Sequence, residues 1–179
     1  MFTNQKIIKF FIFLFCFNIF SSISQTNEDA PLNNIAIFEN PKPISSLIFE
    51  DFSGNEINLD NYHGKLVIIN FWATWCAPCK KEMPSLDRLY QDSNFKNLEI
   101  FAVNMETPNK LKTKNFFENI RIKKLKIFFD SKLNFVKEFK LRGVPTTIFI
   151  NKKGEEFARI IGEANFEDQK FIKWLMKYD

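Results

Sequence analysis

Short apolar runs alternate with turn residues and with stretches of helical spacing along most of the chain. The run Leu66 to Trp72 is rich in β-branched side chains, a pattern typical of a central strand buried on both faces. Beyond it, Met83, Leu86 and Leu89 recur at helical spacing, and Pro84 is expected to kink that helix. Further strands are predicted at 47–49, 56–59, 98–103, 127–129, 146–150 and 156–161, and further helices at 111–120, 133–139 and 165–178.

The order of these elements predicts the fold class. Strands joined by helices favour parallel pairing in the middle of the chain, whereas turn residues at 53–55 and 151–154 indicate two antiparallel hairpins. Asn165 is the expected N-cap of the last helix, with two acidic residues in its first turn. We therefore expect an α/β domain with a mixed central sheet flanked by helices, an N-terminal hairpin and no internal repeat.

The N-terminal segment, residues 1–24, has the layout of a secretory signal. Two lysines lead into an apolar run, and small serines follow it, ahead of an expected cleavage point before Gln25. The run is short for a membrane span, which needs about 20 apolar residues, yet an uncleaved membrane tether through residues 6–23 stays open. Residues 25–43 are interpreted as a linker because they hold many prolines, asparagines and acids, and residues 44–179 as one domain.

Charge excludes one class of partner. The full chain has 25 basic and 21 acidic residues, and setting aside residues 1–24 removes two lysines and no acid. A balance of 23 basic against 21 acidic residues, or +2, is too mild to indicate nucleic-acid binding. The basic stretch from Lys110 to Lys126 is interpreted as a solvated helix face, with an acidic partner or anionic lipid headgroups as the alternative.

The cysteine pair Cys76 and Cys79 lies where a buried strand turns into a helix. Cys16 lies in the signal segment, so the exported chain keeps this pair alone, which points to redox chemistry rather than to a disulfide framework. Unpaired backbone N–H groups at a helix N-terminus favour an anion, so we expect a lowered pKa for the Cys76 thiol. Cys79 lies one turn further in and should be less exposed. We predict that Cys76 attacks a partner disulfide and that Cys79 resolves the mixed disulfide.

A structural zinc half-site is the alternative interpretation of a C-x-x-C pair. Zinc usually needs four Cys or His ligands, and the exported chain offers two cysteines and His63. His63 lies in an expected turn with no partner in view, so a catalytic role is not predicted for it. We expect no metal site and no cofactor.

Two motifs together resemble the thioredoxin superfamily. Residues 72–80 read Trp-Ala-Thr-Trp-Cys-Ala-Pro-Cys-Lys, with a proline five residues after the second cysteine, and residues 143–147 read Gly-Val-Pro-Thr-Thr. The predicted export signal and the residues around the cysteines resemble the TlpA/ResA family of periplasmic or extracytoplasmic reductants even more closely. The likeness covers roughly residues 44–178. It implies a thioredoxin-like fold with a central insertion at about residues 108–127.

The resemblance also implies a client-binding surface. Pro145 would be a cis proline packed against the cysteines. The backbone of Val144 beside it would pair with an extended client peptide. Trp75, directly before the first cysteine, is expected to shape the exposed surface around the thiol.

The expected proton handler is Glu82. Cytosolic thioredoxins keep a buried Asp on the strand before the cysteines, and Asn70 occupies that position here. An amide cannot take a proton from Cys79, whereas Glu82 follows Cys79 by one helical turn, and the TlpA/ResA family places an acid there. Partial burial beneath the thiols would raise the pKa of this carboxyl toward neutrality. A solvated helix Glu paired with a nearby Lys is the alternative.

These features predict an exported thiol–disulfide oxidoreductase that reduces client proteins with C-x-x-C disulfides. Family resemblance implies apocytochrome c or a copper-site protein of cytochrome oxidase as client, and a membrane thiol transporter as electron donor. A disulfide-forming oxidant of exported proteins is the second hypothesis, because the surroundings of the pair tune its potential. The third is a copper metallochaperone on the same fold, which would need a histidine late in the chain, whereas His63 precedes the cysteines.

Overall fold

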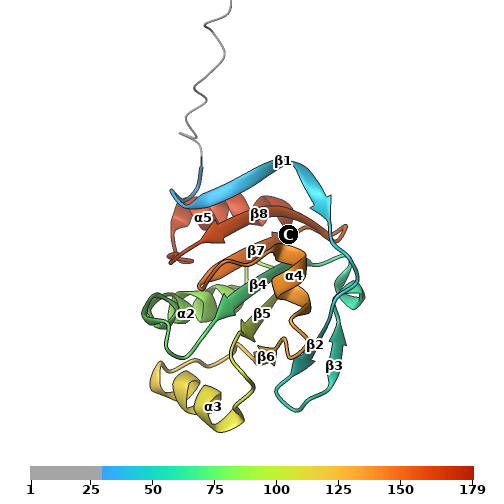
Figure 1. The fold of residues 1–179 in the computed structure, drawn as a ribbon. Helices are drawn as coiled ribbons and strands as arrows, with labels where there is room; N and C mark the ends of the chain where they lie inside the picture. Colours follow the sequence, from blue (N-terminus) through green and yellow to red (C-terminus); the bar gives the residue numbers. More distant parts are fainter. Residues whose placement is uncertain (1–29) are drawn as a thin grey trace, which may run out of the picture. The chain divides into compact units, whose positions relative to one another are not determined.

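The computed structural model describes residues 30–179, and the expected signal or anchor over residues 1–24 lies outside them. Eight strands form one mixed sheet in the order β1-β8-β7-β4-β5-β6-β2-β3 (Figure 1). The strands are β1 (Ile35–Pro43), β2 (Ile48–Asp51), β3 (Glu56–Asn58), β4 (Leu66–Trp72), β5 (Leu98–Asn104), β6 (Ile127–Phe129), β7 (Thr146–Ile150) and β8 (Glu155–Ile161). The helices are α2 (Ala77–Tyr90), α3 (Lys110–Asn119), α4 (Asn134–Phe139) and α5 (Gln169–Leu175), with 3-10 helices η1 (Leu59–Tyr62) and η2 (Met176–Tyr178). Within residues 30–179, no helix is long and apolar enough to cross a membrane.

The pairing of the strands confirms the predicted mixed sheet. β4, β5 and β6 run parallel, as their helical crossovers require. β7 and β8 form the late antiparallel hairpin, and β7 pairs with β4. β2 and β3 form the N-terminal hairpin, which joins the sheet beside β6.

Strand β1 corrects the interpretation of residues 25–43 as a linker. From Ile35 to Pro43 the chain pairs antiparallel with β8, with an irregular register between Ile37 and Lys42. The prolines in this segment suggested a loop, but β1 is the edge strand of the sheet. An edge strand tolerates proline because one side of its backbone needs no partner.

The two faces of β4 carry two halves of the core. Every residue of β4 is buried. On one face, Phe71 meets Phe135 of α4 at 5.6 Å between ring centroids, and α4 lies in front of the sheet in Figure 1. On the other face, Trp72 stacks on Phe116 of α3 at 4.9 Å. Each such aromatic pair contributes about 0.5–1.5 kcal/mol beyond its buried area, so both faces hold β4 in place.

The N-terminus of α5 is capped by a different residue from the one that the sequence pattern predicted. The N-cap of α5 is Asp168, whose carboxylate accepts the backbone N–H groups of Lys170 and Phe171. The expected cap, Asn165, instead accepts the N–H of Glu167 in the preceding turn. Both side chains are suitable for capping, and Asp168 is the cap because the turn that begins at Asn165 ends before the helix starts.

Candidate active site

Cys76 and Cys79 are joined by a disulfide at the start of α2. Cys76 is the N-cap of the helix, and its Sγ accepts the backbone N–H of Cys79 at 3.2 Å. The exposed fraction is 3% for Cys76 and 0% for Cys79, the order that the sequence predicts. Pro78 lies in the first helical turn, where its missing N–H leaves no hydrogen bond unmade.

The loop before β7 lies at the same end of β4 as the cysteines. The peptide bond between Val144 and Pro145 is cis, as the resemblance implied. The Pro145 carbonyl accepts the N–H of Gly162 at 2.9 Å, which ties this loop to the end of β8. Thr146 then pairs with Phe71 near the carboxyl end of β4. Trp75 is 71% exposed on this side of the molecule, as expected of a surface around the thiol.

Glu82 is buried beneath this region, with an exposed fraction of 2%. Its Oε1 accepts Asn70 Nδ2 at 2.8 Å, and its Oε2 accepts the backbone N–H of Ala164 at 3.0 Å. Burial raises the pKa of Glu82 to about 7 and the charge of Glu163 adds to the rise, whereas the two hydrogen bonds act to lower it. The alternative of a solvated helix Glu is therefore wrong, and Glu82 is able to exchange a proton near neutral pH.

Glu106 belongs to the site, although the sequence analysis passed over it. Its carboxylate accepts the backbone N–H of Thr74 at 2.6 Å and the hydroxyl of Thr74 at 3.0 Å, two residues before Cys76. Burial raises the pKa of Glu106, but hydrogen bonds from Lys112 and Thr74 outweigh it and hold the pKa at about 2. The signal was its position just after β5, since the carboxyl ends of parallel strands meet at one edge of the sheet.

A cleft of about 430 Å³ opens between Trp75 and this carboxylate. Its other walls come from the end of β5 and the start of α3, the region of the expected insertion. The residues that line it are Trp75, Asn104, Met105, Glu106, Thr107, Asn109, Lys112 and Thr113. A polar cleft beside an exposed aromatic ring is suited to hold a short peptide segment next to Cys76.

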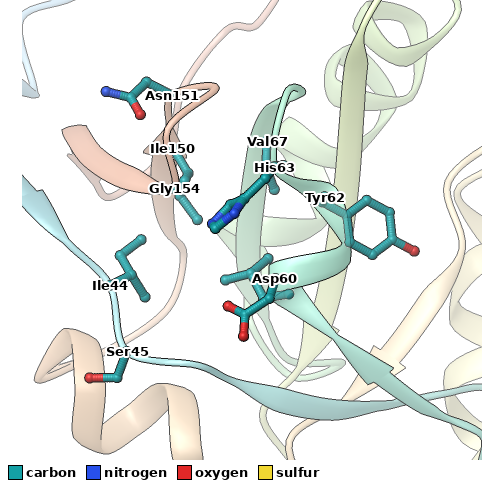
Figure 2. Close-up of a pocket in the computed structure, with 10 residues that line it drawn as sticks. Ile44, Ser45, Asp60, Tyr62, His63, Val67, Ile150, Asn151 and Gly154 are labelled. Atoms are coloured by element: carbon teal, nitrogen blue, oxygen red, sulfur yellow. The ribbon is translucent and has the colours of Figure 1, made fainter.

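His63 lies before β4, at the opposite end of that strand from the cysteines. Figure 2 shows its ring beside Gly154, in a pocket with about 10 Å³ of space, enough for about one water molecule. Its backbone N–H donates to the Asp60 carbonyl at 3.3 Å. Among residues 30–179, no three His, Cys, Asp or Glu side chains gather closely enough to hold a metal ion.

Comparison with known proteins gives the family. Residues 38–155 match the AhpC/TSA family. The chain belongs to that family. It is 37% identical over 110 residues to the thiol-disulfide oxidoreductase ResA of Halalkalibacterium halodurans, a match that covers 62% of this chain and 61% of the relative. It is 36% identical over 121 residues to ResA of Geobacillus kaustophilus, covering 68% of each chain.

Solved structures agree on the fold. StoA from Bacillus subtilis is 27% identical and has a TM-score of 0.62, covering 74% of this chain and 99% of that one. A thiol:disulfide interchange protein of the thioredoxin family from Chlorobium tepidum has a TM-score of 0.64 at 20% identity, with 78% and 99% covered. The predicted thioredoxin-like fold and the resemblance to ResA are confirmed. The described domain is a thiol–disulfide oxidoreductase domain of the ResA type.

Proposed function

We propose that this domain reduces C-x-x-C disulfides in exported client proteins, with Cys76 as the attacking thiol and Cys79 as the resolving thiol. The observation that carries the proposal is the asymmetry of the pair. Cys76 lies at the helix N-cap beside the exposed Trp75, whereas Cys79 is fully buried and one turn from the Glu82 carboxyl. Cys76 is 3% exposed and Cys79 0%, so the small exposed part of the pair belongs to the first cysteine, the one we assign to the attack on a client disulfide.

The exchange takes place in two balanced steps. The Cys76 thiolate attacks one client sulfur, a mixed disulfide forms, and the second client sulfur leaves as a thiolate that takes up a proton. Cys79 then loses its proton, for which Glu82 is the acceptor at hand, and attacks Cys76 Sγ. The client leaves with both cysteines reduced and the enzyme holds the Cys76–Cys79 disulfide. A membrane thiol-electron donor would restore the dithiol.

The client would lie across Trp75, Val144 and Pro145. The backbone of Val144, beside the proline that precedes β7, would offer hydrogen-bonding groups to an extended peptide. The cleft between Trp75 and Glu106 would take the next part of that peptide. Apocytochrome c and copper-site proteins of cytochrome oxidase are the clients that the family resemblance favours, and export through residues 1–24 would bring the enzyme to them.

Trapping tests the proposal directly. A Cys79→Ser variant expressed in the native host should hold clients on Cys76 as mixed disulfides, which mass spectrometry of the partners identifies. Cys76→Ser is the matched control and should trap far less, because its remaining thiol is buried. Equal trapping by the two variants, or none by Cys79→Ser, would refute the assigned roles.

The reduction potential decides the direction of electron flow. A reductant should have a potential near that of thioredoxin, about −270 mV, whereas a value near about −120 mV would support the disulfide-forming oxidant instead. Titration with Cu(I) addresses the metallochaperone, and tight stoichiometric binding would favour that function.

A further inference from the structure

The Asn70 side chain uses one end of its amide and leaves the other without a partner. Its Nδ2 donates to Glu82 Oε1 at 2.8 Å and to Thr147 Oγ1 at 3.0 Å. Its Oδ1 is buried and accepts no hydrogen bond, and the residue as a whole is 0% exposed. Buried acceptors without a donor are rare in folded proteins, so this oxygen needs an explanation.

Reduction of the disulfide would create a new donor on the helix that packs against Asn70. Neither sulfur of the Cys76–Cys79 bond carries a proton, and reduction gives Cys79 an S–H group that can donate. Cys79 and Glu82 are three residues apart on α2, so their side chains share one face of the helix. Glu82 on that face bonds Asn70, so we infer that the reduced Cys79 thiol lies within reach of the same amide.

Protonation of Glu82 also changes which end of the Asn70 amide it can bond. Glu82 Oε2 accepts the N–H of Ala164, so a proton on this carboxyl belongs on Oε1. Oε1 faces Asn70 Nδ2, and two donors would then point at each other. A half-turn of the amide brings Oδ1 to this position, where it accepts from the protonated Glu82 and from the hydroxyl of Thr147. The same half-turn directs Nδ2 to where Oδ1 was.

We propose that Asn70 is a positioning residue whose amide reverses as a proton passes between Cys79 and Glu82. Before transfer, the Cys79 thiol donates to Oδ1 and Nδ2 donates to the ionised Glu82. After transfer, Nδ2 donates to the Cys79 thiolate and Oδ1 accepts from the protonated Glu82. One proton leaves Sγ and one arrives on Oε1, while the amide keeps both of its hydrogens. This inference rests on the proposed roles of Cys79 and Glu82.

The side chains hydrogen-bonded around Glu82 are uncharged, which leaves Glu82 as the one ionisable proton acceptor among them. β4 and β7 contribute the uncharged side chains of Asn70 and Thr147. The nearest charge from the segment after β8 is Glu163, which forms an ion pair with the exposed Lys81 of α2. An Asp at position 70 would place a second carboxylate against Glu82. An amide avoids that repulsion and presents a donor or an acceptor as required.

Nuclear magnetic resonance of the oxidised protein tests the reversal. With asparagine side chains labelled with ¹⁵N, the Nδ2 protons of Asn70 should show contacts to the Thr147 methyl group at pH 9. At pH 5, where Glu82 is protonated, those contacts should weaken and contacts to the Cys79 β protons should replace them. The same set of contacts at both pH values would overturn the inference.

Kinetics supply the second test. In Asn70→Leu, Glu82 loses the hydrogen bond that favours its charged form, so the pH midpoint for resolving a mixed disulfide should rise by about one unit. At pH 7 that corresponds to a rate up to about tenfold lower. Ser85→Ala is the control. Ser85 is buried one turn after Glu82, donates to the Glu82 backbone carbonyl and accepts the Phe166 N–H, and it makes no hydrogen bond to the Asn70 side chain or to the Glu82 carboxyl.

The outcomes separate the two proposals. An Asn70→Leu protein that traps clients normally and keeps the wild-type pH profile would refute the role of Asn70 alone. A wild-type protein that exchanges no disulfide would refute the proposed function. If Asn70→Leu does not fold, the spectroscopic measurement on the wild-type chain decides.

Discussion

Replacing Glu82 by Gln should remove most of the pH dependence of the stability of the oxidised protein between pH 5 and 8. The carboxyl is 2% exposed, and its burial raises the pKa from 4.5 to about 7. In this window the folded chain binds a proton that the unfolded chain has released. The stabilising contribution of this group is therefore fully present below about pH 4.5 and is lost as the pH rises through 7.

The expected magnitude follows from the size of the shift. A rise from 4.5 to about 7 corresponds to about 3 kcal/mol of unfolding free energy, at about 1.4 kcal/mol per pKa unit. Glu82→Gln cannot ionise, so its stability should vary little with pH. The oxygen of the replacement amide can still accept from the Ala164 N–H, whereas its NH2 group faces the donor end of Asn70 unless that amide reverses, so its cost at pH 5 should be about 1–3 kcal/mol.

Urea unfolding of the oxidised protein at several pH values measures this difference, because the disulfide removes the thiols from the titration. Wild type should lose about 3 kcal/mol between pH 4.5 and 8 through this group. Glu118→Gln, which removes an exposed carboxyl of α3, is the control and should keep the wild-type slope. A Glu82→Gln protein with that same slope would refute the assignment of a near-neutral pKa to Glu82.

Two further substitutions test the packing around the site. Asp87→Asn should cost about 2 kcal/mol in urea unfolding, because the buried Asp87 carboxylate accepts the backbone N–H groups of Lys123, Lys124 and Leu125; an unchanged midpoint would contradict this. Gly154→Ala should cost about 1–3 kcal/mol in thermal unfolding, since Gly154 has a φ of +80° and an added Cβ would meet the His63 ring. Adding His63→Ala should restore the share of the lost stability that comes from the contact between the new Cβ and the His63 ring (Figure 2). If it restores none, the positive φ of residue 154 accounts for the whole loss.

Local signals in the sequence determined most of the fold and the position of the cysteine pair. The strand patterns predicted β4 to β8 because apolar runs of this kind have one stable environment, a sheet covered on both faces. The C-x-x-C spacing at a strand-to-helix junction predicted the disulfide pair and its unequal exposure. Strand β1 escaped prediction because its prolines resemble those of a linker, and only its pairing with β8 makes it a strand.

The tertiary structure alone decided the environment of Glu82. The residues around it, Asn70, Thr147 and Ala164, come from β4, β7 and the segment after β8, and no spacing along the chain brings them together. The position of Glu106 just after β5 places it at the same sheet edge as Thr74, but only the folded chain shows that its carboxylate bonds Thr74. A sequence specifies which residues are able to ionise or to donate a hydrogen. Burial and partners set the pKa of each group, and both arise from packing between distant segments.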